Sequence, residues 1–240
     1  MPETSSFDGL RVEGLQVRYR GGLALHGVDF ELVPGARMAV VGRNGAGKSS
    51  LVRSIAGLVP AYAGRVTWKG ENVTRYQAAR RVRAGISLVP EGRQIFPELT
   101  VAENLRIGGF TAGREMAQRR AQVYDVFPAL ADRAEQAASQ LSGGEAQMLA
   151  IGQALMASPS LIMLDEPSFG LAPVVIARLL EIIKELSARG IAVLLVEQSV
   201  RLALSLGGDV YVLDGGKLRL AAAAGVDVDP EVLQAAYLGS

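Results

Sequence analysis

A glycine-rich loop between an apolar strand and a helix constrains the fold of this chain more than any other feature. Residues 37–41 (RMAVV) are typical of a buried strand, and they run directly into Gly42-Arg43-Asn44-Gly45-Ala46-Gly47-Lys48-Ser49. A helix is predicted from Lys48 to Gly57. Glycines let the backbone curl so that several N–H groups point inward, and the helix start adds a positive dipole end. The pattern predicts a phosphate-binding loop of an α/β fold, the alternative being a plain glycine-rich turn.

A second apolar strand ends in two acidic residues. Residues 161–165 (LIMLD) are apolar up to Asp165, and Glu166 and Pro167 follow. Ligands of open α/β sheets bind at the carboxyl ends of the strands, so we expect both carboxylates beside the glycine loop. Asp165 is then a water-mediated partner of Mg²⁺, and Glu166 orients or deprotonates an attacking water. Without the glycine loop, the same residues would read as an acidic strand-to-loop transition.

The two motifs together predict a site for a nucleoside triphosphate and Mg²⁺. Lys48 should reach the β- and γ-phosphates, and the Ser49 hydroxyl should ligate Mg²⁺. The residues expected to bind ATP through this loop are Gly42, Arg43, Asn44, Gly45, Ala46, Gly47, Lys48, Ser49 and Ser50.

Strands and helices alternate along most of the chain. Strands are expected at 10–19, 27–33, 64–68, 86–89, 191–196 and 209–213, and helices at 76–84, 173–188, 199–206 and 230–238. From 101 to about 157 the pattern is almost wholly helical. Gly21-Gly22 and Asp214-Gly215-Gly216-Lys217 read as hairpin turns. Such alternation predicts a mostly parallel sheet with helices on both faces, and the helical stretch predicts a second lobe.

Composition excludes several other functions. The 25 basic and 24 acidic residues nearly cancel, so no charge excess points to nucleic acid. There is no cysteine, and the single histidine, His26, rules out a histidine-rich metal site. The N-terminus lacks a secretion signal pattern, and no apolar run approaches the ~18 residues needed to span a bilayer. We expect a soluble, cytoplasmic protein that reaches a membrane only through partners.

A short segment between the two motifs narrows the family. Leu141-Ser142-Gly143-Gly144-Glu145 is, by itself, a helix cap. In the order phosphate loop, LSGGE and LIMLDEP, however, essentially the whole chain resembles the ATP-binding subunit of an ABC transporter. In that family two subunits sandwich two ATP molecules, each between one subunit's phosphate loop and the other's LSGGE. The resemblance implies that Ser142 and the glycine N–H groups face the γ-phosphate of ATP held by the other subunit.

The resemblance also implies a domain plan. We expect one domain over 1–240, with a core at 1–90 and 158–240 that includes an N-terminal antiparallel β part. The helical subdomain at 91–157 is expected to be inserted into this core. The family further places an aromatic residue against the adenine ring, and Tyr19 matches that position. The alternative role of Tyr19 is strand packing.

Three departures from the common family pattern point to one branch. Glu91 stands where glutamine is usual, Gln198 where the switch-loop histidine is usual, and Ala172 where an aspartate is usual. With their neighbours, these residues resemble the second ATPase of branched-chain amino acid importers, whose close relatives serve other amino acids, amides or urea. Glu91 would contact Mg²⁺ or its waters, and the Gln198 amide would donate to the γ-phosphate.

The implied partners follow from this branch. They are a second, non-identical ATPase, permease subunits in the membrane and, indirectly, a substrate-binding protein. The chain would lie on the inner face of the membrane, with a groove near Ile95-Phe96-Pro97 and Leu99 for a permease helix, although these residues could also be core. Rival readings are a chromosome- or repair-type ABC ATPase, a nucleotide sensor without turnover, and an exporter. Only about 90 residues separate the phosphate loop from LSGGE, too few for a long coiled coil, and Glu166 argues against the sensor.

Overall fold

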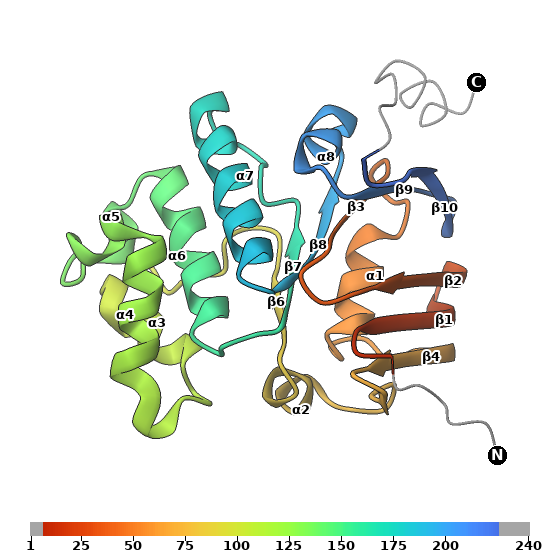
Figure 1. Cartoon of the computed structure of the whole chain (residues 1–240), viewed down its shortest axis with the longest axis horizontal. Coiled ribbons are helices and arrows are strands. Elements are labelled where there is room, and N and C mark those ends of the chain that lie inside the picture. Colours follow the sequence, from red (N-terminus) through yellow and green to blue (C-terminus); the bar gives the residue numbers. More distant parts are fainter. Residues whose placement is uncertain (1–6, 226–240) are drawn as a thin grey trace.

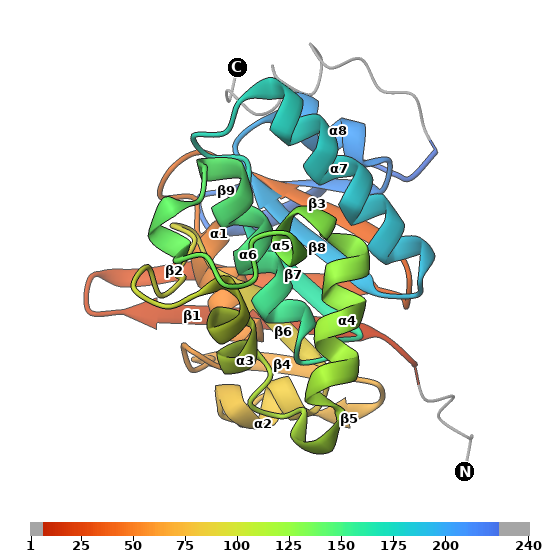
Figure 2. The same cartoon turned by 90° about the vertical axis from the view of Figure 1, so that its left-hand side faces the viewer.

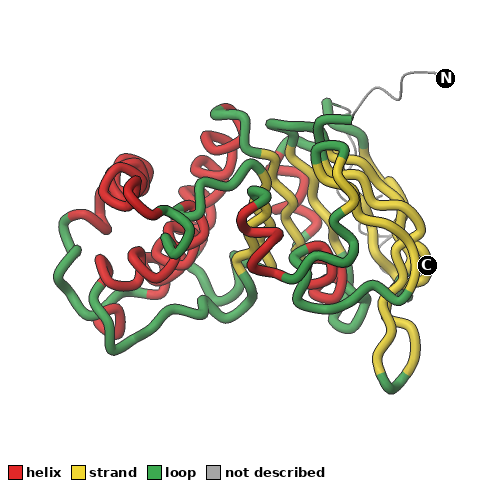
Figure 3. Tube along the Cα trace, turned by 90° about the horizontal axis from the view of Figure 1, so that it is seen from below, coloured by secondary structure: helices red, strands yellow, loops and turns green. Residues whose placement is uncertain are grey.

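Two β-sheets and a group of helices form the structure, a computed structural model that describes residues 7–225. Helices α3 to α6 lie on one side, a larger sheet in the middle, and a smaller sheet on the other side (Figure 1). Seen from below, helices and strands separate toward opposite ends (Figure 3). The helix expected at 230–238 lies outside the described residues.

The strands and helices have the following bounds. The strands are β1 (Leu10–Tyr19), β2 (Gly22–Leu32), β3 (Arg37–Val41), β4 (Ala63–Trp68), β5 (Glu71–Asn72), β6 (Ile86–Val89), β7 (Leu161–Asp165), β8 (Ala192–Glu197), β9 (Asp209–Asp214) and β10 (Lys217–Ala222). The α-helices are α1 (Lys48–Ile55), α2 (Ala78–Arg83), α3 (Val101–Gly108), α4 (Met116–Val126), α5 (Pro128–Ala131), α6 (Gly143–Leu155), α7 (Pro173–Ala188) and α8 (Val200–Leu206). Two short 3₁₀ turns, η1 (Gly113–Glu115) and η2 (Ala138–Gln140), lie between them.

The larger sheet confirms the predicted mostly parallel core. Its strand order is β10-β9-β3-β8-β7-β6, and only the β9–β10 pair is antiparallel. The smaller sheet, in the order β2-β1-β4-β5, is antiparallel throughout, as expected for the N-terminal β part. The parallel register aligns the carboxyl ends of β3, β7 and β8, from which the candidate site is built.

The larger sheet separates two hydrophobic cores. Along β3, Ala39 and Val41 face one core, whereas Met38 and Val40 face the other. The second core also holds apolar residues of α1 and of the smaller sheet, so α1 is packed between the two sheets (Figure 1). Burial on both faces explains why β3, β7 and β8 are continuous apolar runs without polar alternation.

Helix α6 lies in the middle of the helical group and packs against α3, α4 and α5 (Figure 2). At Gly152 the helices approach closely, because an added Cβ would lie 3.0 Å from a Val123 methyl carbon and 3.1 Å from one of Leu105. Capping boxes start two of these helices, Thr100 with Glu103 on α3 and Ser142 with Glu145 on α6.

Several element bounds differ from the sequence expectation. Strand β2 begins at Gly22 instead of residue 27, because it pairs with β1 up to the hairpin turn. Helix α1 ends at Ile55, and the stretch 101–157 is broken into four α-helices and two 3₁₀ turns. Strand β8 extends to Glu197, which places Gln198 immediately after the strand end.

A buried arginine fixes the far end of α1. Arg81, on α2, is 2% exposed, and its guanidinium donates only to main-chain carbonyls: Ser54 O at 2.9 Å, Thr74 O at 2.9 Å, Tyr76 O at 3.1 Å, and Ile55 O. Burial lowers the pKa of Arg81 to about 10, so the group stays charged at neutral pH. A cation at the C-terminus of a helix satisfies carbonyls that have no partner within the helix and opposes the negative dipole end.

We therefore expect Arg81→Met to lower the free energy of unfolding by about 3 kcal/mol, because it leaves several buried carbonyls without donors. Urea unfolding followed by circular dichroism would measure the change. Arg83→Met is the matched control, since Arg83 is exposed on the same helix, and it should shift stability by less than about 0.5 kcal/mol. Equal shifts for the two variants would contradict this role of Arg81.

Candidate functional site

A cavity of about 590 Å³ lies where β3, β7 and β8 end. This volume is in the range of small-molecule sites. Its lining comes from the glycine loop, the end of β1, the acidic strand and two predicted loop positions: Tyr19, Ala24, Asn44, Gly45, Gly47, Lys48, Ser49, Ser50, Glu91, Glu166, Phe169 and Gln198. The structure thus gathers predicted residues from five separate stretches of sequence around one cavity.

Two features of the glycine loop explain its sequence. Gly45 and Gly47 have φ angles of 83° and 109°, in the left-handed region that side chains disfavour. At Gly47 an added Cβ would also lie 2.6 Å from the carbonyl oxygen of Ala24. Gly47 is the N-cap of α1 without a side-chain cap, and no acidic residue lies in the first turn. The first N–H groups of α1 are therefore available to a bound anion.

Lys48 is buried at the start of α1 and faces Glu166. Its Nζ donates to Gly42 O at 2.7 Å and to Arg43 O at 3.2 Å, and it lies 2.9 Å from Glu166 Oε1. Only 4% of the lysine side chain and 8% of the glutamate side chain are exposed. A buried charge without a partner is costly, so Lys48 needs an anion beside it, and phosphate groups entering the cavity would compete with Glu166 for that place.

Ser49 and Asp165 form a polar pair that fits a divalent cation. The Ser49 hydroxyl donates to Asp165 Oδ1 at 3.2 Å, while the buried Oδ2 has no hydrogen-bond partner. Burial raises the pKa of Asp165, the Ser49 hydrogen bond opposes the rise, and the negative charge of Glu91 adds to it. Within residues 7–225 no cluster of three acidic or histidine side chains could hold a metal by itself. A hydroxyl and a free carboxylate oxygen suit Mg²⁺, which takes its remaining ligands from phosphate and water.

Glu166 has a strained backbone beside this pair. Its φ of 48° is left-handed, which costs a non-glycine residue roughly 1–2 kcal/mol. Its N–H donates to Val196 O at 2.9 Å, and its Oε2 accepts from Gln198 Nε2 at 2.5 Å. From the sequence we expect the Gln198 amide to donate to the γ-phosphate. In the structure this amide donates to the carboxylate of Glu166.

Tyr19 lies at the rim of the cavity and is 45% exposed. Its hydroxyl accepts a hydrogen bond from Ser50 Oγ at 3.3 Å, which joins β1 to α1. Glu91 is exposed on the opposite loop and lines the same cavity. Two lining residues were not predicted: Ala24 lies near the start of β2, and Phe169 follows Glu166 by three residues. Ala24 and Phe169 have side chains without ionisable or hydrogen-bonding groups, so no motif in the sequence indicated them.

The LSGGE segment does not line this cavity. Ser142 Oγ accepts from the Glu145 N–H at 3.3 Å, and Glu145 Oε2 accepts from the Ser142 N–H at 2.9 Å, so the segment forms a capping box. An arginine from the Glu91 loop lies over it: Arg93 Nη2 donates to Phe169 O at 3.2 Å, and an added Cβ on Gly143 would lie 3.0 Å from Arg93 Nη1. The glycine at 143 therefore makes room for Arg93.

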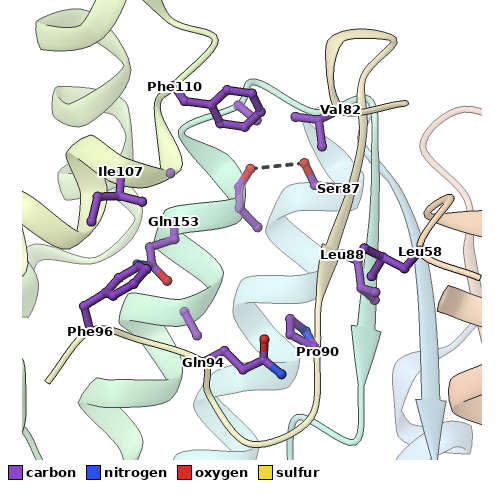
Figure 4. Close-up of a pocket in the computed structure, with 14 residues that line it drawn as sticks. Leu58, Val82, Ser87, Leu88, Pro90, Gln94, Phe96, Ile107, Phe110 and Gln153 are labelled. Atoms are coloured by element: carbon purple, nitrogen blue, oxygen red, sulfur yellow. Dashed lines mark hydrogen bonds between the residues drawn. The ribbon is translucent and has the colours of Figure 1, made fainter. Parts of the chain in front are cut away.

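An apolar groove of about 360 Å³ separates the helical group from the core (Figure 4). Phe96, Ile107 and Phe110 line one side, and Leu58, Val82 and Leu88 line the other. The sequence placed this groove near 95–99. The structure divides that stretch, because Phe96 lines the groove while Ile95 packs against the hydrophobic core. None of the residues that line the groove carries a charge. No helix in residues 7–225 is long and apolar enough to cross a membrane.

Comparisons with known proteins agree with this geometry. The family profile described as "ABC transporter" matches residues 25–169. The high-affinity branched-chain amino acid transport ATP-binding protein BraG of Pseudomonas aeruginosa is 43% identical over 218 residues, covering 90% of this chain and 93% of the relative. The probable branched-chain amino acid transport ATP-binding protein LivF of Archaeoglobus fulgidus is 36% identical over 214 residues, with 87% and 89% covered. A solved ATP-binding cassette of an ABC transporter, in its ADP conformation, is 28% identical with a TM-score of 0.83, covering 95% of this chain and 93% of that one.

The Lys48–Glu166 pair predicts how nucleotide affinity responds to substitution. We expect Glu166→Gln to tighten ATP binding about tenfold, because it removes the carboxylate that competes for Lys48 and repels phosphate. Titration with a fluorescent ATP analogue would measure the dissociation constant. Glu185→Gln, an exposed carboxylate paired with Arg189 on α7, is the control and should leave affinity unchanged. Weaker binding by Glu166→Gln would show that the ion pair does not compete with phosphate.

Proposed function

This chain belongs to the ABC transporter family, and we propose that it is the ATP-hydrolysing motor subunit of an importer for branched-chain or other hydrophobic amino acids. The observation that carries the proposal is the match over nine-tenths of the chain to a branched-chain amino acid transport ATP-binding protein. The buried Lys48, Asp165 and Glu166, with the half-buried Gln198 beside them, support the hydrolytic part.

The glycine loop would hold the phosphates of ATP. The backbone N–H groups of residues 42–50 and the start of α1 supply donors, and Lys48 moves from Glu166 to the β- and γ-phosphates. Ser49 and Asp165 would hold Mg²⁺, with Glu91 near its waters, and the free Oδ2 of Asp165 supports this assignment. Bound Mg²⁺ supplies charge neutralisation on the phosphate oxygens. Tyr19, exposed at the rim, would stack on the adenine ring.

Glu166 would accept the proton of the attacking water or orient it, once Lys48 has turned to phosphate. Gln198 holds Glu166 through its amide N–H and is within reach of the same region of the cavity. Glutamine has no titrating group, so Gln198 can position the carboxylate and donate a hydrogen bond but cannot exchange a proton. The retained Glu166 with its two partners favours turnover over the rival sensor role.

A second ATPase subunit would complete the site. Residues 141–145 lie away from this chain's own cavity, and their glycine N–H groups begin α6. We assign Leu141, Ser142, Gly143, Gly144 and Glu145 to the ATP that a partner ATPase holds, in agreement with the implied sandwich. The departures at Glu91, Gln198 and Ala172 resemble a branch of importers that use two different ATPases. They therefore support a partner that is not identical to this chain.

Permease subunits would dock in the apolar groove. We propose that the helical subdomain 91–157 and the core share this groove, which accepts the apolar face of a short permease helix because its lining is uncharged (Figure 4). The loop that begins at Glu91 in the nucleotide cavity reaches Phe96 in the groove, so one short segment touches both. Docking there would hold the chain on the inner face of the membrane through its permease subunits.

The test is ATPase activity of the reconstituted complex with permease, second ATPase and binding protein. We expect leucine, isoleucine or valine to stimulate hydrolysis several-fold, and the complex with Glu166→Gln to bind ATP without turnover. ATP binding with no hydrolysis by the unmodified complex would favour the sensor. Stimulation by amides or urea in place of amino acids would contradict the proposed substrate class.

A further inference from the structure

The last residue of β8 is a buried carboxylate that the proposed mechanism does not use. Glu197 is 3% exposed. Its Oε1 accepts from the Ser168 N–H at 3.1 Å, and its Oε2 accepts from the Gln198 N–H at 3.2 Å. Burying a charged group is costly unless it is satisfied by hydrogen bonds, so a carboxylate at this position needs a reason.

Both donors belong to segments that hold Glu166. Ser168 is two residues after Glu166, on the turn whose backbone is left-handed at Glu166. Gln198 donates its side-chain amide to Glu166 Oε2 at 2.5 Å. Through its two oxygens, Glu197 therefore fixes the backbone on which Glu166 stands and the backbone from which Gln198 reaches it.

The strained turn is tied to β8 at two points. The Glu166 N–H donates to Val196 O at 2.9 Å, and the Ser168 N–H donates to the Glu197 carboxylate. The main-chain oxygen of Glu197 also accepts from the Gly42 N–H at 3.3 Å, at the start of the glycine loop. A backbone conformation that is unfavourable by itself persists only where its surroundings over-determine it, and Glu197 supplies part of that constraint.

The two N–H groups explain why the side chain is a carboxylate. A carboxylate accepts on both oxygens, whereas a glutamine accepts on one and presents an NH₂ group in place of the other. Burial raises the pKa of Glu197, and the hydrogen bonds from Ser168 and Gln198 oppose that rise, so these two bonds favour the charged form. Replacing Glu197 by glutamine keeps the size of the side chain and removes one of the two ties.

We propose that Glu197 is a positioning residue for hydrolysis, holding Gln198 and the turn of Glu166 so that the Gln198–Glu166 contact is kept. The inference rests on the proposed function, since it assigns a role in the ATP hydrolysis that Glu166 performs. The Glu197 carboxylate hydrogen-bonds to the main-chain N–H groups of Ser168 and Gln198, not to the side chains of Glu166 or Gln198. Its effect on those two side chains therefore passes through the main chain.

The experiment compares Glu197→Gln with the unmodified chain in the reconstituted complex. We expect kcat to fall on the order of tenfold, as for other supporting residues around a reactive site, while the KM and dissociation constant for ATP change less than about twofold. In a Gln198→Ala background the same substitution should lower kcat by a clearly smaller factor, because part of its effect passes through Gln198. The exposed control Glu185→Gln should change none of these quantities.

A crystal structure of Glu197→Gln provides a second measurement that does not depend on turnover, and we expect it to show the Gln198–Glu166 hydrogen bond broken. An unchanged kcat, an equal factor in both backgrounds, a matching loss of ATP affinity, or a retained Gln198–Glu166 contact would each overturn the inference while leaving the proposed function in place. An unmodified complex that binds but does not hydrolyse ATP would instead overturn the proposed function, and the inference with it.

Discussion

Parallel pairing of β3, β8 and β7 is the constraint on which the rest of the structure depends. The register sets Val41 opposite Glu197 and Asp165 opposite Val196, so the three strands end together at one edge of the sheet. The glycine loop leaves that edge from β3, the two acids leave it from β7, and Gln198 leaves it from β8. Without this alignment, residues more than a hundred positions apart in sequence could not share one buried ion pair and one cavity.

Three polar side chains at this edge, Lys48, Glu166 and Gln198, form a continuous line of contacts. Lys48 is held by Glu166, and Glu166 is held by Gln198. We propose that phosphate draws Lys48 away and leaves Glu166 with its amide partner and a free oxygen, with which it could act on water. In the proposed function, the same residue pair would link nucleotide binding to release of the Glu166 carboxylate. The loop from Glu91 to Phe96 extends that link to the apolar groove, where we place the permease.

Short apolar runs and fixed spacing made much of this predictable. The strands at 37–41, 86–89 and 161–165 and the helix at 173–188 have the bounds expected from sequence. Strands buried on both faces are mostly apolar up to a polar residue or a turn, and Pro173 marks the first turn of the helix. Other features depend on distant contacts. No local sequence pattern connects the segments that these contacts join. The contacts are the Lys48–Glu166 pair, the four carbonyls around Arg81, the core side of the groove and the Glu197–Ser168 hydrogen bond.

We propose that this chain contributes half of an ATP site to a partner ATPase. Vanadate trapping of a photoreactive, radioactive ATP analogue in the reconstituted complex, with Ser142→Ala in this chain, tests it most directly, because the label reports which subunit's phosphate loop has hydrolysed nucleotide. We expect trapped label to be lost from the partner ATPase, while direct photolabelling shows that this chain still binds ATP at Lys48. Loss of ATP binding by this chain, with trapping on the partner intact, would contradict it.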